Sequence, residues 1–513
     1  MRALMRIRFF FVLCGLCLAT LFQHMEASCA SKDKLILAIP VETTTGDPMK
    51  HAEIYGFVNL RPIFDHLLDR VFRDGRIQSL PGLATSWENI DDKTWVFHFR
   101  KGVKFHNGED FNSEVVKFNI ERIIDPATKA PPRMFFSNIV RVDILDKYTL
   151  KITTKVPSPV LINDLSFAMA IVPLQYTKEK GNEYVASHPV GSGPFKFVRW
   201  IKGEEMVYEA NENYWAGPPK VKTLVIKSIP EDSTRVAALL GESVDIISKV
   251  PTHMFPMINK SGVAKAIAVP SPLAMAIHLD SNNEGPLRDK RVRQALNYAV
   301  DKESIIKNIL DGYGTPLGQL LTAAHFGHNP NLKPYPYDPK KAKSLLKEAG
   351  YGEGLTLVFN SPNGRYEKDK EIAEAITNQL AKVGVNLKLQ FHEWGNYFTS
   401  VRAHKAGPMY LLAWAGDLDA DLNLFPFLHS EGFLSMVSDK NLDSVLVQAR
   451  HTLDIKEREK LYYKITQIAY DEAYALFLHN GSDTYAANNR VQNWKPVPDP
   501  GIAMRMENVW PRD

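Results

Sequence analysis

The stretch Met409-Tyr-Leu-Leu-Ala-Trp414-Ala-Gly416-Asp417 decides the fold of the region around it. Its apolar run has the length of a buried strand, ends at Gly416 and is followed at once by a carboxylate. Earlier in the chain, a similar strand is followed by a loop that contains Arg365. A negative and a positive side chain at the ends of neighbouring strands suit a small zwitterionic molecule.

The residues before this stretch predict alternating strands and helices. Asp338 and Pro339 are an N-cap and a first helical residue, and Gly350 ends that helix. The elements expected next are a strand at 355–360, a helix at 369–383, a strand at 385–391, a helix at 394–403 and a strand at 409–414. This order predicts a parallel sheet with right-handed crossovers. Arg365 and Asp417 should therefore share its carboxyl edge, where open α/β sheets bind ligands.

A second unit of the same kind is expected nearer the start of the chain. Its elements are a strand at 221–227, a helix at 231–240 and a short strand at 244–247. Between residues 60 and 185 the pattern changes, because Thr94–Arg100 and Tyr148–Thr153 alternate as exposed-edge or half-buried strands. We interpret that region as an α+β insertion.

Residues 1–30 have the features of a secretory signal peptide. A basic start precedes the apolar run Phe9–Phe22, and Ser28-Cys29-Ala30 fits cleavage after Ala30. Acylation at Cys29, as in a lipoprotein, is the alternative. No later segment has the length of apolar sequence that a membrane span needs, so we expect a soluble mature chain outside the cytoplasm.

Composition narrows the class of protein further. A formal net charge of +4 over 513 residues gives no basis for nucleic-acid binding or for a polybasic membrane patch. The cysteines, Cys14, Cys17 and Cys29, all lie within or at the edge of the predicted signal peptide, so disulfides should not stabilise the mature chain. Its length is sufficient for a large core and implies about two or three domains.

A series of short motifs runs along nearly the whole mature chain. They are Leu80–Trp87, Trp95–Gly108, Phe111 with Val115–Phe118, Pro189–Phe195, Asn213–Trp215, Arg288–Lys302, Gln379–Val385 and Trp414–Asp417. In this order they resemble the family 5 extracellular solute-binding proteins, which are the peptide, nickel and opine receptors of bacterial ABC importers. The resemblance implies a periplasmic, monomeric, two-lobed α/β binding protein that closes on a small peptide-like ligand and delivers it to permease subunits.

The resemblance also implies how the chain is divided. The expected parts are a core of lobe I at 31–60, 186–268 and 476–513, an inserted subdomain of lobe I at 61–185, and lobe II at 269–475.

Four residues are candidates for the ligand site. In peptide-binding members of the family, the aspartate of the Trp-x-Gly-Asp motif pairs with the α-ammonium of the ligand, and Asp417 matches it. An upstream arginine that holds the α-carboxylate aligns with Arg365, and Trp414 and Tyr366 would wall the pocket. The structural alternatives are a helix N-cap for Asp417, a surface salt bridge for Arg365 and a core position for Trp414.

Other ligands and activities have weaker support. After Asp417 the acids alternate, but Leu422 and Leu428 stand where a calcium loop needs glycine and glutamate. His325 and His328 lack further metal ligands at useful spacing. We expect no metal and no cofactor, although a nickel chelate, an opine or a glutathione-like conjugate are alternatives to a peptide.

Two other classes of protein are alternatives to a receptor. A periplasmic peptidase would need a nucleophile or metal motif, and neither HExxH nor GxSxG occurs. We therefore predict no enzymatic activity. An adhesion or chaperone-like surface protein would be favoured only if Cys29 were acylated and no small ligand were found.

Overall fold

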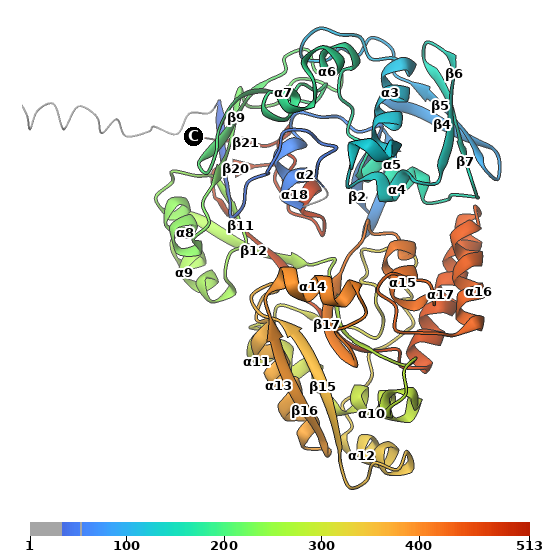
Figure 1. Ribbon diagram of the computed structural model, residues 1–513. Coiled ribbons are helices and arrows are strands. Elements are labelled where there is room, and N and C mark those ends of the chain that lie inside the picture. The colour runs from blue at the N-terminus through green and yellow to red at the C-terminus, as the bar shows by residue number, and fades with distance from the viewer. Residues whose placement is uncertain (1–32, 52–53, 513) are drawn as a thin grey trace, which may run out of the picture.

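Two β-sheets, one in each lobe, organise the part of the chain that the computed structural model describes, residues 33–51 and 54–512 (Figure 1). The predicted signal peptide and Cys29 lie outside these residues. Within them, no helix is long and apolar enough to cross a membrane.

The first sheet has seven strands in the order β12-β19-β11-β1-β10-β9-β8. Their bounds are β1 Lys34–Ile39, β8 Phe195–Ile201, β9 Glu205–Ala210, β10 Thr223–Ser228, β11 Ile246–Ser248, β12 Ala264–Pro270 and β19 Ser482–Asn488. The central strand β1 runs parallel to both β10 and β11, and helix α8 (Asp232–Leu240) connects those two neighbours. The second parallel unit predicted from the sequence is therefore confirmed.

The second sheet has six strands in the order β14-β18-β13-β17-β15-β16. Their bounds are β13 Ala274–Leu279, β14 Thr315–Pro316, β15 Leu355–Pro362, β16 Val385–His392, β17 Met409–Trp414 and β18 Ala475–Asn480. The strand β15 pairs in parallel with both β16 and β17, and helices α13 (Asp369–Ala381) and α14 (Trp394–Arg402) lie between these strands in sequence. The predicted β-α-β-α-β unit is confirmed.

Helices cover both faces of this second sheet, which explains why β17 has no polar residue. Leu411 packs with α10 (Lys290–Ala299), α12 (Pro339–Glu348) and α13 on one face. Tyr410 and Leu412 pack on the other face with α15 (Ala420–Leu428), α16 (Lys440–His451) and α17 (Ile455–Asp471). Continuous apolar strands are typical of sheets that are buried on both faces.

The α+β subdomain lies beside the first sheet and has its own core. Its antiparallel sheet has the order β4-β5-β7-β6, and the hairpin β2-β3 forms a separate pair. The bounds are β2 Leu68–Arg73, β3 Arg76–Pro81, β4 Ala84–Asp91, β5 Thr94–Phe99, β6 Ile139–Asp146 and β7 Thr149–Thr154. Helices α3 (Ser113–Ile124) and α5 (Leu161–Phe167) contribute to a core around the fully buried Phe97. In Figure 1, α5 faces the second lobe near α15.

The chain crosses between the two sheets from β12 to β13 and again from β18 to β19. The two crossovers are hydrogen-bonded to each other: the amide of Ser271 donates to Gly481 O at 2.8 Å, and Asn480 Nδ2 donates to Ser271 O at 2.8 Å. The boundary expected at 268/269 lies close to the first crossover. The return to the first lobe, expected after residue 475, comes only after Asn480, because β18 pairs with β13 in the second sheet. Two short, paired connections of this kind suit a hinge.

Candidate ligand-binding cleft

A cavity of about 540 Å³ lies between the two lobes, where the carboxyl ends of parallel strands from both sheets meet. On the side of the first sheet, Ile39 ends β1 and Ser248 ends β11. On the side of the second sheet, Arg365 lies in the loop after β15 and Ala415 follows β17. In both lobes, therefore, the cavity lies at the carboxyl edge of the sheet, where open α/β sheets bind ligands. We call this expectation the sheet-edge rule.

The walls of this cavity are mostly apolar and carry a small number of charges. Tyr55, Val58, Leu273, Tyr485 and Met504 are among the apolar and aromatic residues. The charged residues in the lining are Lys249, Arg365 and Asp483. An apolar cavity of a few hundred cubic ångströms with a few polar groups is typical of small-molecule sites.

Arg365 reaches the cavity from an exposed loop and rests on aromatic rings. Its guanidinium carbon lies 4.5 Å from the ring centroid of Trp394 and 5.8 Å from that of Tyr366. Asp369 caps the loop, since its carboxylate accepts the backbone amides of Gly364, Arg365 and Tyr366. Among the described residues Arg365 forms no ion pair with an acid, so its charge is available to a ligand.

Asp417 lies in a different environment, at a direct contact between the lobes. Gly416 has φ +52° and Leu418 has φ +66°, so the chain turns sharply on either side of it. The residue is fully buried, and its carboxylate accepts hydrogen bonds from Asn163 Nδ2 of α5 and from the amide of Asp419. Arg70 Nη2 also donates to Asp417 O at 2.7 Å. The carboxylate does not line the cavity around Arg365.

A second buried carboxylate, that of Asp164, faces Asp417 from α5. Burial and then the charge of Asp419 raise the pKa of Asp417 to about 6. Burial and then the charge of Asp417 raise the pKa of Asp164 well above its ordinary value. Two close carboxylates cannot both ionise at low cost, so this contact retains a proton near neutral pH.

The acids that follow Asp417 have arginine partners of their own. Asp419 forms a bidentate ion pair with Arg458 at 2.6 and 2.7 Å, and Asp421 pairs with Arg450 at 2.7 Å. Asp419, not Asp417, is the N-cap of α15. The alternating acids therefore fix the start of α15.

Trp414 and Tyr366 pack close to this region without lining the cavity. The indole of Trp414 is half-buried, donates from Nε1 to Leu422 O at 2.9 Å and packs edge-on to Phe427. The hydroxyl of Tyr366 donates to Ala413 O at 3.2 Å. The structure thus brings Arg365 into the cavity and leaves Asp417, Trp414 and Tyr366 beside it, so a binding role for the four together stays a prediction.

Sequence reasoning missed two charged residues of the cavity, Lys249 and Asp483. Lys249 Nζ lies 3.3 Å from Asp483 Oδ1. Lys249 follows the strand predicted at 244–247, so the sheet-edge rule used for Arg365 could have found it. Asp483 lies in β19, and no strand was expected there.

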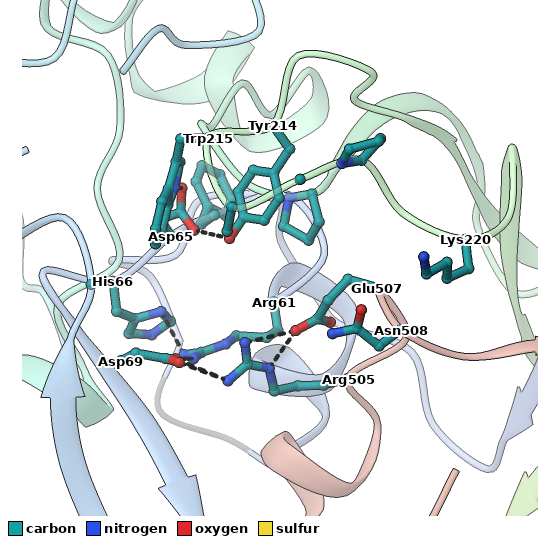
Figure 2. A pocket seen from close by; sticks show the side chains of 16 residues that line it. Arg61, Asp65, His66, Asp69, Tyr214, Trp215, Lys220, Arg505, Glu507 and Asn508 are labelled. Carbon is teal, nitrogen blue, oxygen red and sulfur yellow. Dashed lines mark hydrogen bonds and ion pairs between the residues drawn. The ribbon is translucent and has the colours of Figure 1, made fainter. Parts of the chain in front are cut away.

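Two other cavities are less suited to a zwitterion. Figure 2 shows one of about 300 Å³ within the first lobe, where Arg505 pairs with Asp69 and Glu507. There, burial raises the pKa of Asp65 to about 6, and Tyr214 and Trp215 donate hydrogen bonds to its carboxylate. These charges largely satisfy one another. A cavity of about 710 Å³ beside the crossovers has a mostly apolar lining, in which Lys495 is a cation and no acid occurs.

The histidine pair considered as a metal site is used differently. His325 Nε2 lies 3.0 Å from Ala415 O, and its Nδ1 lies 3.1 Å from the amide of Thr322. Nε2 therefore helps to fix the turn before Asp417, while Nδ1 helps to fix the segment that begins at Thr322. Within residues 33–51 and 54–512, no three His, Cys, Asp or Glu side chains are grouped so that they could hold a metal ion.

Two sheets joined by paired crossovers, with a cavity between their carboxyl edges, define a two-lobed periplasmic binding protein. Residues 79–435 match the model of the bacterial extracellular solute-binding proteins, family 5. The chain belongs to this family. Both the predicted fold class and the predicted role as a solute-binding protein are confirmed.

Similar proteins span nearly the same length. The chain is 27% identical to the glutathione-binding protein GsiB of Escherichia coli, over 90% of this chain and 91% of that protein. It is 32% identical to heme-binding protein A of Haemophilus influenzae, over 80% of each. The periplasmic binding protein DppA from Helicobacter pylori, in complex with the peptide STSA, is 26% identical with a TM-score of 0.76, over 94% of this chain and 98% of that one. These relatives are binding proteins rather than enzymes.

Proposed function

We propose that the protein binds a di- or oligopeptide-like zwitterion between its lobes and delivers it to the permease subunits of an ABC importer. The observation that carries this proposal is Arg365, a cation without an acidic partner among the described residues, in a mostly apolar cavity between the lobes. A charge-assisted hydrogen bond from a guanidinium to a carboxylate contributes about 1.5–3 kcal/mol. Similarity to a peptide-bound structure supports the ligand class.

Asp417 would bind the ammonium group of the same ligand. Its carboxylate lies on the contact between the lobes, so opening of the hinge would separate it from Asn163 and expose it to an incoming ligand. The ammonium would then replace the amide of Asn163 when the lobes close again. Trp414 and Tyr366 would shape the adjoining wall.

The class of protein also bears on its location, its processing and its assembly state. We propose that the mature protein is a periplasmic monomer released by cleavage after Ala30, with acylation at Cys29 as the alternative. It would have no enzymatic activity, because its task is to close on a solute and present it.

A glutathione-like solute is the second candidate. Lys249 and Arg365 both line the cavity, and a solute with two carboxylates could contact one with each. The similarity to a glutathione-binding protein supports it. Glutathione therefore belongs in the same titration as the peptide.

Calorimetry with blocked ligands tests the proposal. L-Ala-L-Ala, its N-acetyl form and its C-terminal amide are titrated into the wild type, Arg365→Ala and Asp417→Asn, with glutathione as a further ligand. Arg365→Ala should weaken binding of the free dipeptide roughly ten- to a hundredfold and affect the C-terminal amide far less. Asp417→Asn should likewise weaken binding of the free-amine dipeptide far more than binding of its N-acetyl form. Equal losses for free and blocked ligands would contradict the two roles.

A further inference from the structure

Two buried polar residues of the first lobe face the cavity from adjacent strands. Ser248 is the last residue of β11, and Asp483 is the second residue of β19. The two strands pair antiparallel, with Ser248 opposite Tyr485. Ser248 is 7% exposed and Asp483 is 5% exposed, and both line the cavity that contains Arg365.

Each of these side chains has an atom that lacks a hydrogen-bond partner among the described residues. Asp483 uses Oδ1 for Lys249, which leaves Oδ2 unpaired, and the hydroxyl of Ser248 is also unpaired. The carbonyl of Ser248 is not free, since Arg235 Nε donates to it at 3.2 Å. Buried polar atoms are nearly always satisfied, and an unsatisfied one has a substantial cost.

The chemistry of these unpaired atoms determines which ligand groups can bind to them. A carboxylate oxygen accepts hydrogen bonds only, while a serine hydroxyl both donates and accepts. A ligand carboxylate placed against Oδ2 of Asp483 would be repelled, whereas an N–H group at that place would satisfy this oxygen.

We propose that Asp483 and Ser248 form a subsite that binds the peptide N–H of the ligand, whose ammonium group is left to Asp417. This inference rests on the proposed function and deepens it. Arg365 holds the ligand from the second lobe and the subsite holds it from the first, so one small molecule is anchored to both lobes. Solutes with an N–H at this place are selected over isosteres without one.

The test compares L-Ala-L-Ala with two analogues by calorimetry. One is the depsipeptide, in which an ester oxygen replaces the amide N–H, and the other is the des-amino analogue, which keeps the amide and lacks only the ammonium assigned to Asp417. The wild type should prefer the dipeptide over the depsipeptide by roughly ten- to a hundredfold. Asp483→Asn should reduce that preference to a few-fold, because an amide that keeps its oxygen on Lys249 presents an NH₂ donor to the cavity.

Two further variants separate direct binding from a structural role. Lys249→Met removes the ion pair but keeps Asp483, so it should retain the preference. Ser248→Ala, a small change that should not impair folding, should lower the preference by a few-fold. An unchanged preference in Asp483→Asn and Ser248→Ala, or an equal loss in Lys249→Met, would overturn the subsite. A wild type that binds neither the dipeptide nor glutathione would overturn the proposed function itself.

Discussion

Arg365 and Asp417 follow neighbouring parallel strands, yet their side chains have opposite environments. Arg365 lies on an exposed loop, rests on Trp394 and reaches a cavity. Asp417 is fully buried, and Asn163 and Arg70 hold it at a contact between the lobes. A position at the carboxyl edge of a sheet therefore places a residue near the cleft. Contacts with the opposite lobe then determine whether its side chain faces the cavity or is buried between the lobes.

The buried contact at Asp417 and the cavity at Arg365 therefore have different roles in this arrangement of the lobes. The sealed contact stabilises one arrangement of the lobes, and the open cavity supplies charges that a ligand can reach. Substitutions in α5 and in the hairpin β2-β3 should therefore act on lobe contact without touching the cavity.

The largest effect should come from Arg70→Ala. The buried side chain of Arg70 donates to Asp499 at 2.9 Å, to Asn163 at 3.0 Å and to Asp417 O at 2.7 Å. Its loss leaves Asp499 without this ion pair, so the free energy of unfolding should fall by about 3–5 kcal/mol. Urea denaturation measures the loss, and small-angle scattering should show lobes that separate more readily.

A matched control for this substitution is Arg199→Ala. Arg199 pairs with Glu205 on the surface, where its side chain is 54% exposed. Exposed pairs contribute about 0–1 kcal/mol, so this variant should be close to the wild type. Equal losses of unfolding free energy in both variants would mean that the contact between the lobes contributes no more to stability than an exposed ion pair.

Much of the site's framework could be predicted because its signals are local. The periodicity of 338–420 predicted β15, β16 and β17 and their parallel order, since helix and strand periods are properties of adjacent residues. Parallel order then placed Arg365 and Asp417 at one edge. The N-cap at Asp338 is confirmed by its hydrogen bond to the amide of Lys341.

The environments of these side chains could not be predicted in the same way. Arg70 and Asp417 are 347 residues apart in sequence, and Lys249 and Asp483 are 234 apart. Contacts at such separation arise from the packing of whole lobes and leave no periodic pattern in one sequence. The sequence therefore indicated the edge of the sheet without showing that Asp417 would be sealed.

An intermediate effect is expected for Asp164→Asn, which changes the acid that faces Asp417. Asp419 with Arg458, Asp421 with Arg450, and Arg70 are the other charges around this pair. Because the folded-state pKa values of Asp164 and Asp417 are raised, the folded protein keeps protons that the unfolded chain releases. Stability should therefore fall as the pH rises from about 4 past the value of about 6 for Asp417.

The amide in Asp164→Asn stays neutral throughout and can donate to Asp417. The fall with pH should become shallower, and the variant should be more stable than the wild type at pH 7.5 by on the order of 1–3 kcal/mol. Urea denaturation at pH 4.5 and 7.5 measures this. Asp110→Asn, which removes an exposed partner of Lys104, is the control and should leave the slope unchanged. An identical slope in Asp164→Asn and the wild type would show that the two carboxylates do not share a proton.

The smallest effect should come from Tyr366→Phe, a substitution beside Arg365, which lines the cavity. The substitution removes the hydrogen bond to Ala413 O but keeps the ring beside Arg365, so stability should fall by about 1 kcal/mol or less. The affinity for L-Ala-L-Ala should stay within a few-fold, whereas Tyr366→Ala, which removes the ring, should weaken it roughly tenfold. Calorimetry and urea denaturation on both variants measure these effects. If the two variants lose affinity equally, the hydroxyl is the group that matters, and the ring of Tyr366 does not position Arg365 for the ligand.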